Sequence, residues 1–259
     1  GSEWDVDVMG TIKAMPTQAV IMERCQGTLD DLMVSERLTD KELAAFLTQV
    51  ILSLAILQKT LNLTHNDLHT NNIMYTDTKK TFLNYKLGGR HYKVPTHGRI
   101  AKIIDYGRAI YEYDGTRFCS GSYAPKGDAE MQYNTEPFFD ISKPRIDPNP
   151  SFDLCRLSCA LADFIIGDPP YGTSPTTGLD GVEAAIMSWC KAEDGSFLLY
   201  DKHGEEKHPG FELYEVIAKE ATGCTPLEAL RAPCFQQFIA GRKRIRGSIC
   251  DIDKLPSMT

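Results

Sequence analysis

The stretch that decides the fold is a short polar segment between apolar residues, and it reads Leu63-Thr64-His65-Asn66-Asp67-Leu68-His69-Thr70-Asn71-Asn72-Ile73. A long apolar run precedes it, so the polar residues are expected to form a loop that follows a core helix. Acidic, amide and imidazole side chains gathered in such a loop are candidates for binding or catalysis, because rigid neighbours position them. The loop is therefore the first candidate site of the chain.

A core helix is predicted before this loop. Thr39-Asp40-Lys41-Glu42 has the Ser/Thr-x-x-Glu form, in which the two side chains satisfy each other's free backbone N–H groups at a helix start. Apolar residues then recur at helical spacing up to about Lys59, at Leu43, Phe46, Leu47, Val50, Ile51, Leu54 and Leu57. The breadth of this stripe indicates burial.

Short strands and further helices are predicted around these two elements. Residues 19–22 resemble a buried strand, residues 81–94 alternate about Gly88-Gly89 as in a hairpin, and residues 101–104 form a strand that ends at Asp105. The stretch 111–150 is expected to be irregular, and helical patterns cover 152–166, 182–190, 211–221 and 226–239. This order predicts an α+β fold that is mainly helical.

Composition excludes several classes of protein. The chain has 259 residues, 42% of them hydrophobic, and the run from Phe46 to Leu57 is broken by polar residues, so no membrane partner is expected. A formal net charge of -7 argues against a nucleic-acid coat, and the basic run from Arg242 to Arg246 is local. The eight cysteines have no Cys-x-x-Cys spacing, so they are expected to be reduced, with Cys155 and Cys159 in the core.

The acidic residues point to phosphate chemistry. Asp67 lies in the polar loop, and Asp105 ends a strand and precedes Tyr106-Gly107. Together with Asn72 they supply the oxygen ligands that Mg²⁺ accepts, besides a free carboxylate that could orient a hydroxyl for attack on a phosphate.

These motifs resemble those of the protein-kinase-like superfamily. The polar loop is similar to its His-Arg-Asp catalytic loop, and Ile103-Ile104-Asp105-Tyr106-Gly107 is similar to its Asp-Phe-Gly metal motif. Asp-Leu-His in the loop and the hairpin before the metal Asp resemble haspin-like kinases, and kinases of large DNA viruses look similar too. Residues 151–157 resemble the buried helix whose Asp holds the catalytic loop, and Thr225–Leu230 resembles the last helices of the large lobe.

The resemblance implies a large, C-terminal lobe with its hinge and no small lobe in this chain. Residues 1–16 would be a cloning remnant, at Gly1-Ser2, followed by a remnant of the small lobe, and residues 17–26 its last strand and the hinge. Residues 27–250 would be the large lobe, with a hairpin insertion at 79–99 and an activation segment at 105–150, before a tail at 251–259. The small lobe is expected upstream in the natural protein.

Site roles follow from the same resemblance. Asp67 would orient the substrate hydroxyl and His69 would lie near the transferring phosphate, while Asn72 and Asp105 would bind the Mg²⁺ that bridges the phosphates of ATP. His65 would pack beneath the metal motif. On the nucleotide side, Met22 would be the gatekeeper, Glu23 and Cys25 would meet adenine, and Asp30 or Asp31 would reach ribose.

Departures from the family pattern suggest a different activation segment. Asn66 replaces the Arg that pairs with a phosphorylated activation loop, so activity is predicted not to depend on such phosphorylation. No Ala-Pro-Glu motif occurs near Pro137.

Three functions stay open on the sequence. The first is ATP- and Mg²⁺-dependent phosphoryl transfer to Ser or Thr of a protein substrate, inside a cell (in cytoplasm or nucleus) or in a virion. The second is a pseudokinase or lobe-only scaffold without catalysis. The third keeps the chemistry but uses a small molecule of the aminoglycoside or choline kind, because His-x-Asp-Leu-His-x-x-Asn also resembles the motif of such phosphotransferases.

Overall fold

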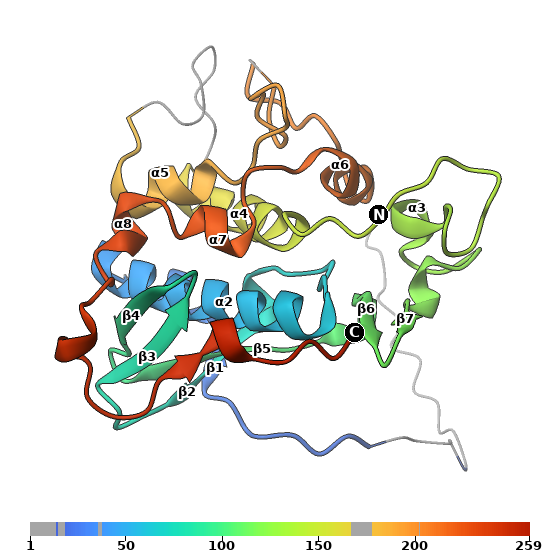
Figure 1. Ribbon diagram of the computed structural model, residues 1–259. Coiled ribbons are helices and arrows are strands. Elements are labelled where there is room, and N and C mark those ends of the chain that lie inside the picture. Colours follow the sequence, from blue (N-terminus) through green and yellow to red (C-terminus); the bar gives the residue numbers. More distant parts are fainter. Residues whose placement is uncertain (1–13, 15–18, 36–37, 167–177, 202) are drawn as a thin grey trace.

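The computed structural model describes residues 14, 19–35, 38–166, 178–201 and 203–259 (Figure 1). The predictions for residues 1–18 therefore lie outside the described residues, except at residue 14. The fold contains both helices and strands, with 38% helix and 17% strand. The prediction of an α+β fold with more helix than strand is confirmed.

Helix α2 (Asp40–Leu61) is the central element. The predicted capping box is present: the Thr39 hydroxyl accepts a hydrogen bond from the Glu42 amide at 3.3 Å, and the Glu42 carboxylate accepts one from the Thr39 amide at 3.0 Å. The helix stops at Asn62, which has the left-handed φ of 46° that ends many helices. The predicted core helix is confirmed.

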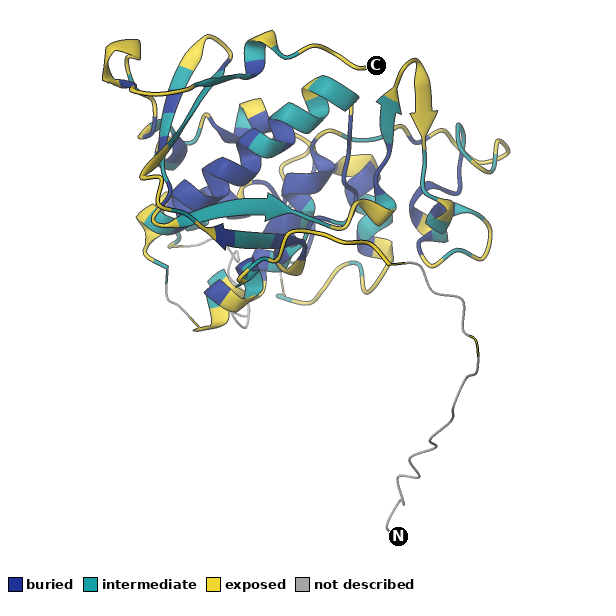
Figure 2. Ribbon diagram, turned by 90° about the horizontal axis from the view of Figure 1, so that it is seen from below, coloured by how far each residue is buried: buried dark blue, intermediate teal, exposed yellow. Residues whose placement is uncertain are grey.

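Other elements cover α2 on several sides. Strands β4 (Arg90–Pro95) and β5 (Arg99–Ile103) pack against it, as do the helices α5 (Gly181–Met187), α7 (Pro226–Ala229) and α8 (Pro233–Gln236). Within the described ranges α2 is the one helix that is long and apolar enough to cross a membrane, but 67% of its most apolar window is buried inside the protein. Packing in a core accounts for this composition (Figure 2).

A buried glutamine joins α2 to the neighbouring sheet. The Gln49 amide nitrogen donates to the Arg99 carbonyl at 3.2 Å, and its oxygen accepts from the Ala101 amide at 3.1 Å. Both partners lie on β5, the strand at the edge of its sheet, so the glutamine supplies hydrogen bonds to the backbone of an edge strand. The polar residue that interrupts the apolar stripe thus fixes the helix against the strand.

The central sheet positions the two candidate metal ligands. Strands β1 (Gly27–Thr28), β2 (Ile73–Asp77) and β5 are antiparallel, in that order. Ile73 at the start of β2 is paired with Ile103 at the end of β5, and the Ile104 amide donates to the Asn72 carbonyl at 3.0 Å. Asn72 and Asp105 therefore leave the same end of the sheet.

A second sheet carries the predicted hairpin. Strands β3 (Phe82–Leu87) and β4 are joined through Gly88-Gly89, whose φ angles of 58° and 73° favour glycine, so this prediction is confirmed. Strand β8 (Cys250–Asp251) pairs with β3 in parallel. Asp253 accepts hydrogen bonds from the amides of Gly88, at 2.7 Å, and Gly89, at 3.0 Å. Residues 251–254, expected to be tail, thus pack against the hairpin.

The stretch 111–150 is more ordered than predicted. It contains the hairpin of β6 (Tyr111–Tyr113) and β7 (Thr116–Phe118), followed by helix α3 (Glu130–Tyr133). The expectation of an irregular segment is wrong for these residues, because strands of three residues are too short to display an alternating pattern.

The remaining helices largely follow the predicted pattern. Helices α4 (Phe152–Ile165) and α6 (Glu212–Glu220) lie where they were expected, α5 is shorter than predicted, and α1 (Leu29–Ser35) begins after β1. The single helix predicted over 226–239 is wrong: α7 and α8 are separate. Pro233 causes the break, since it lacks an N–H group and is favoured at the first position of a helix.

The strand predicted at residues 19–22 does not form. Val20, Ile21 and Met22 are 73%, 98% and 74% exposed, and no described strand pairs with them. In Figure 2 this segment belongs to the yellow stretch nearest the N-terminal end. Apolar sequence alone cannot make a strand, because its backbone needs hydrogen-bond partners and its side chains need a surface to cover.

Candidate active site

A buried carboxylate on α4 fixes the backbone of the polar loop. Asp153 is 1% exposed, and its two oxygens accept hydrogen bonds from the amides of His65, at 3.0 Å, and Asn66, at 2.9 Å. Burial raises the pKa of Asp153, while His65 and the two amides act in the opposite direction. Asp153 thus holds the polar loop to the start of α4, whose sequence at residues 151–157 resembles the buried helix that follows the activation segment of kinases.

His65 connects the two loops that carry the acidic residues. It is wholly buried, its Nε2 lies 2.8 Å from the Ile104 carbonyl, and its ring lies 5.1 Å from that of Tyr106. Asp105 stands between these two contacts in the chain. The imidazole therefore lies beneath the Ile104–Tyr106 segment, where the resemblance placed it.

Asn66 connects the same loop to the segment that follows Asp105. It has a left-handed φ of 64° and is buried. Its amide nitrogen donates to the Arg108 carbonyl at 3.1 Å, and its oxygen accepts from the Tyr133 hydroxyl at 3.3 Å. At the position where the family pattern has an arginine, Asn66 thus makes neutral hydrogen bonds to the Arg108 carbonyl and to Tyr133 on α3.

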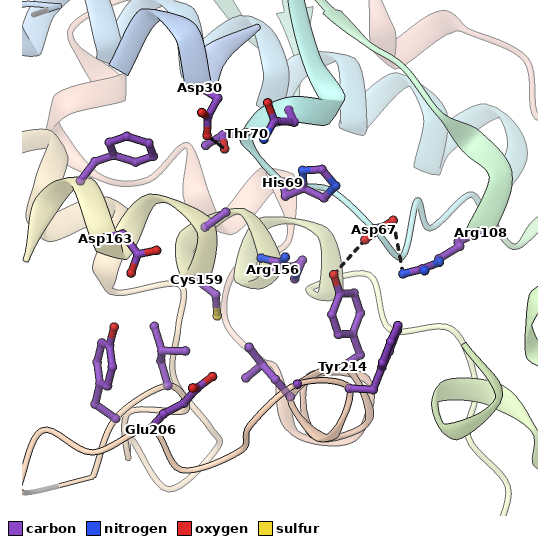
Figure 3. Close-up of a pocket in the computed structure, with 18 residues that line it drawn as sticks. Asp30, Asp67, His69, Thr70, Arg108, Arg156, Cys159, Asp163, Glu206 and Tyr214 are labelled. Atoms are coloured by element: carbon purple, nitrogen blue, oxygen red, sulfur yellow. Dashed lines mark hydrogen bonds and ion pairs between the residues drawn. The ribbon is translucent and has the colours of Figure 1, made fainter. Parts of the chain in front are cut away.

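The Asp67 carboxylate has a partner on each oxygen (Figure 3). Its Oδ1 accepts a hydrogen bond from the Tyr214 hydroxyl at 3.0 Å, and its Oδ2 lies 3.3 Å from an Arg108 guanidinium nitrogen. The side chain is 16% exposed, and Arg108 is also paired with Asp128 at 3.2 Å. Burial opposes the charge of Arg108, but Asp67 and Asp128 raise the pKa of its guanidinium. The side chain of Asp67 is therefore held between a guanidinium group and a phenol hydroxyl.

Sequence reasoning missed both partners of Asp67. Arg108 directly follows the Asp105-Tyr106-Gly107 motif, so its position was a usable signal. Tyr214 lies on α6, 147 residues from Asp67, and nothing in its local sequence distinguishes it from a core aromatic residue. Its ring also faces the guanidinium groups of Arg108, at 5.8 Å, and Arg156, at 5.0 Å.

Asn72 and Asp105, the two candidate metal ligands, lie on adjoining loops, and each has a side-chain oxygen that a metal ion could bind. The Asn72 side-chain nitrogen donates to the Asp67 carbonyl at 2.9 Å, which leaves the amide oxygen available as a ligand. Asp105 is exposed and adopts a left-handed φ of 60°, and its Oδ1 accepts from the Gly107 amide at 3.3 Å. Oxygen ligands of these two kinds fit a hard cation such as Mg²⁺.

His69 lies in the polar loop itself, and Asp30 on α1 contacts that loop. Burial lowers the pKa of His69, although Asp67 acts in the opposite direction, so the imidazole is neutral at pH 7. Asp30 accepts a hydrogen bond from the Thr70 hydroxyl at 2.6 Å, and Asp31 accepts one from the Thr28 amide at 2.8 Å. The carboxylates of Asp30 and Asp31 thus each accept a hydrogen bond within the protein.

A groove of about 720 Å³ runs from Asp67 along α4. Asp67, His69 and Arg108 lie towards one end in Figure 3, and Asp163 and Glu206 towards the other. Asn72 and Asp105 do not line it. The groove is therefore on the side of Asp67 that faces α4 and α6, and it has room for an extended substrate.

The residues predicted to meet the nucleotide base make few contacts with the rest of the protein. Met22 is exposed, and Cys25 is partly buried. The exposed Glu23 carboxylate lies 3.0 Å from Lys102 on β5. The Gln26 amide donates to the Tyr75 carbonyl at 2.9 Å. The structure joins the loops that carry Asp67, His69, Asn72 and Asp105 by hydrogen bonds.

Comparison with known proteins gives partial matches. No protein-family model matches the chain. The chain is 34% identical to the serine/threonine-protein kinase haspin of Mus musculus over 94 residues, which make up 34% of this chain and 12% of that protein. It is 37% identical to haspin of Bos taurus over 71 residues, which make up 27% of this chain and 9% of that protein.

This similarity supports a kinase-like relationship. The match spans only about a tenth of the length of each curated relative, so the activity and partners of the whole relatives are not carried over by it.

Proposed function

We propose that this chain is the catalytic large lobe of a protein kinase, which transfers the γ-phosphoryl group of ATP to Ser or Thr hydroxyls with Mg²⁺. The observation that carries the proposal is the meeting of Asp67, Asn72 and Asp105 on two adjoining loops, each tied to the sheet or to α4. The partial similarity to haspin, together with this arrangement, favours a kinase-like enzyme.

Asp67 orients the attacking hydroxyl in this proposal. Its carboxylate accepts the proton of the substrate hydroxyl as the oxygen approaches the phosphorus. The Tyr214 hydroxyl already donates to Oδ1, so a substrate hydroxyl competes with it at that atom. Arg108 lies 3.3 Å from Oδ2 and holds the orientation of the carboxylate. The neutral His69 contributes a hydrogen bond at most, with no fixed charge.

Asn72 and Asp105 would hold Mg²⁺ through their free oxygens. The bound ion would neutralise charge on the phosphates of ATP. The chain's own part is to fix the two ligands: Asn72 is tied to the Asp67 carbonyl, and Asp105 follows Ile104, which is bonded to the Asn72 carbonyl. A shift of one loop relative to the other would therefore disturb both ligands.

The adenine side of the site is the part that a small lobe would complete. Met22, Glu23 and Cys25 lie in the exposed segment next to β2 and β5, in the order expected of a hinge. Asp30, near the end of the groove, would reach ribose if Thr70 releases it. We place the small lobe upstream in the natural protein and its activity inside the cell; the source, viral or cellular, does not enter the mechanism.

The groove beside Asp67 favours an extended protein substrate over an amino alcohol. Its volume of about 720 Å³ extends along α4 well beyond the carboxylate. A small-molecule phosphotransferase would be expected to enclose its substrate more completely. A comparison of phosphate transfer to a Ser/Thr peptide library and to aminoglycosides or choline separates the two.

The central test is Asp67→Asn in the natural protein that carries this chain together with its upstream sequence. Phosphate transfer to peptides should fall by about 10²- to 10⁴-fold, because the general base is lost. Asp77→Asn is the matched control, since Asp77 is exposed at the far end of β2 and its change should leave transfer intact. Transfer that persists in Asp67→Asn would refute the catalytic role.

A binding measurement separates the enzyme from a scaffold. Mg-ATP should raise the melting temperature of the wild-type chain, and Asp105→Asn should reduce that shift, because a metal ligand is lost. A wild-type protein with neither a thermal shift nor phosphate transfer would favour the scaffold and overturn the proposal.

A further inference from the structure

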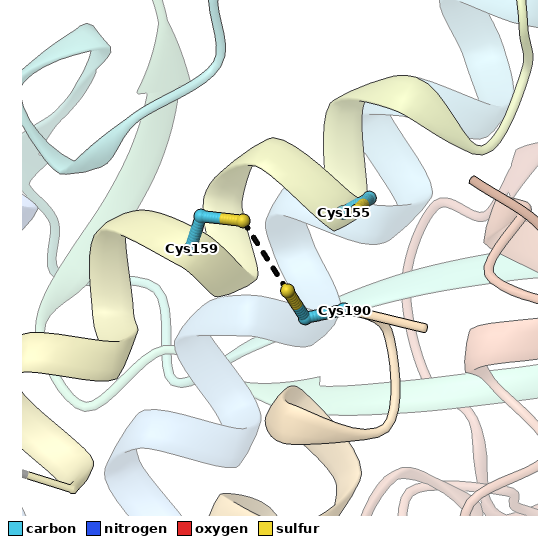
Figure 4. Close-up of side chains that lie close together, drawn as sticks. All are labelled: Cys155, Cys159 and Cys190. Carbon is cyan, nitrogen blue, oxygen red and sulfur yellow. Dashed lines mark hydrogen bonds between the residues drawn. The ribbon is translucent and has the colours of Figure 1, made fainter. Parts of the chain in front are cut away.

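Three buried cysteines meet beside the groove (Figure 4). The sulfur atoms of Cys155, Cys159 and Cys190 all lie within 4.8 Å of one another. Cys155 and Cys159 are four residues apart on α4, so the helix places them on one face, and Cys190 follows α5, which packs against α4. The sulfurs of Cys159 and Cys190 are 3.3 Å apart.

The chemistry of the cluster favours a sulfur–sulfur bond over a metal ion. A structural zinc site takes four ligands, and the described residues offer no fourth Cys, His, Asp or Glu to this group. All three side chains are buried, and metal thiolates would leave net negative charge there. A disulfide is uncharged and apolar, so the surroundings of Cys159 and Cys190 suit it.

We propose that Cys159 and Cys190 form an oxidisable dithiol in the wall of the groove, which a hydroperoxide closes to a disulfide and a thiol reductant reopens. In the first step the thiolate of one cysteine of the pair attacks a peroxide oxygen of hydrogen peroxide, the O–O bond breaks, and a sulfenic acid and hydroxide form. In the second step the sulfur of the other cysteine attacks the oxidised sulfur, the S–O bond breaks, and the proton of the attacking thiol leaves with hydroxide as water. The peroxide is reduced and the two thiols are oxidised.

The positions of the two sulfurs suit this sequence of steps. A disulfide has an S–S length of about 2 Å, so the sulfurs must approach by roughly one ångström, which small side-chain rotations can supply. Neighbouring thiols of Cys155 and Cys159, and then the amides of Leu199 and Leu198, lower the pKa of Cys190, although burial opposes this.

Access comes from the groove. Cys159 is 6% exposed and lies on the groove lining, whereas Cys155 and Cys190 are wholly buried. A small oxidant such as hydrogen peroxide can therefore reach the pair through the groove, while a bulky thiol reagent meets Cys159 first. The oxidation itself does not depend on the proposed kinase function.

A bond at this place would change the groove wall. The Leu198 amide donates to the Cys190 carbonyl at 3.1 Å, and the next two residues, Leu199 and Tyr200, line the groove. A disulfide would tie this segment to α4 covalently. Amide hydrogen exchange in residues 191–201 should then be slower in the oxidised protein than in the reduced one.

Tryptic digestion distinguishes the possible pairings. Cleavage after Arg156 and Lys191 releases a peptide that holds both Cys159 and Cys190, with no Lys or Arg between them, while Cys155 falls in the preceding peptide. After treatment of the full chain with hydrogen peroxide and alkylation of free thiols, the 157–191 peptide should have lost two hydrogens and carry no alkyl group. A reductant should restore alkylation at both cysteines.

Matched variants test the assignment. Cys155→Ser, on the same face of α4, should still form the disulfide, whereas Cys190→Ser should show no loss of two hydrogens in the 157–191 peptide after peroxide. Thermal unfolding checks that each variant is folded, and the wild-type peptide analysis stands even where a variant is not. Peroxide-treated wild-type protein in which both cysteines remain alkylatable, or in which Cys155 is the bonded residue, would overturn the proposal.

Discussion

Two segments predicted to line one nucleotide site are held in opposite ways. In the polar loop 63–72, Asp153 accepts hydrogen bonds from two backbone amides, Asn66 donates to the Arg108 carbonyl, and the Asn72 carbonyl accepts from the Ile104 amide. In residues 19–25 the side chains are largely exposed, and the ion pair between Glu23 and Lys102 lies at the surface. The core of the protein thus positions the polar loop, whereas residues 19–25 are not fixed by it.

Removal of the Asp153 carboxylate should have the largest effect on this contrast. Asp153→Ala leaves the amides of His65 and Asn66 buried without partners, so the free energy of unfolding should fall by roughly 3–5 kcal/mol. Chemical denaturation measures the change. Asp163→Asn, exposed on the same helix, should cost less than about 0.5 kcal/mol. Equal effects of the two changes would mean that the loop is not anchored through α4.

Matched isoleucines compare the two segments directly. Ile73, next to the loop, is 0% exposed, and Ile21 is 98% exposed. Ile73→Ala should lower the free energy of unfolding by about 2–5 kcal/mol, because it opens a cavity, and Ile21→Ala should change it by less than about 0.5 kcal/mol. A large cost at Ile21 would show that residues 19–22 are covered in solution, which would remove the contrast.

Asn66 tests how the loop's backbone is held. Asn66→Ala and Asn66→Gly both lose the bonds to Arg108 and Tyr133, but only Ala is strained at a φ of 64°. The glycine variant should therefore be more stable than the alanine variant by about 1–2 kcal/mol in denaturant unfolding. If the two variants are equally stable, the left-handed backbone at this position is not retained.

The smallest expected effect concerns the pH dependence at His69. Its pKa in the folded protein is lowered by burial, so the unfolded chain binds the proton more readily. The contribution of neutral His69 to the free energy of unfolding is fully present above the pKa of the unfolded chain, near 6.5, and is lost as the pH falls below that value. Because the residue is only half-buried, the loss should stay below about 1 kcal/mol. His69→Gln should flatten this part of the stability profile; an unchanged slope would assign it to another group.

Local patterns predicted the elements whose causes are local. The capping box at Thr39 and Glu42, the Gly88-Gly89 turn and the apolar stripe of α2 each depend on residues within a few positions, and all three are present. The motif positions of Asp67, Asn72 and Asp105 could also be found in this way. Pro233 was a local signal too, and neglecting it joined α7 and α8 into one helix.

Contacts between distant residues could not be found from these patterns. Tyr214 reaches Asp67 across 147 positions, and Cys190 reaches Cys159 across 31. Neither residue has a local pattern that marks its partner, because such contacts depend on how α4, α5 and α6 pack. The same reason explains why the strand predicted at residues 19–22 is not formed. The apolar composition of these residues favours a strand, but a local pattern does not show whether a partner strand lies beside it.

The sequence by itself determined the capped start of α2, the turn at Gly88-Gly89 and which residue types stand at the two acidic loops, because capping, backbone φ and side-chain periodicity are set within a few residues. Only the tertiary structure decided that Asp67 is held between Tyr214 and Arg108, that Cys159 meets Cys190, and that residues 19–22 stay exposed. Burial and long-range hydrogen bonds depend on the whole arrangement of the elements, so they are decided only when those elements pack.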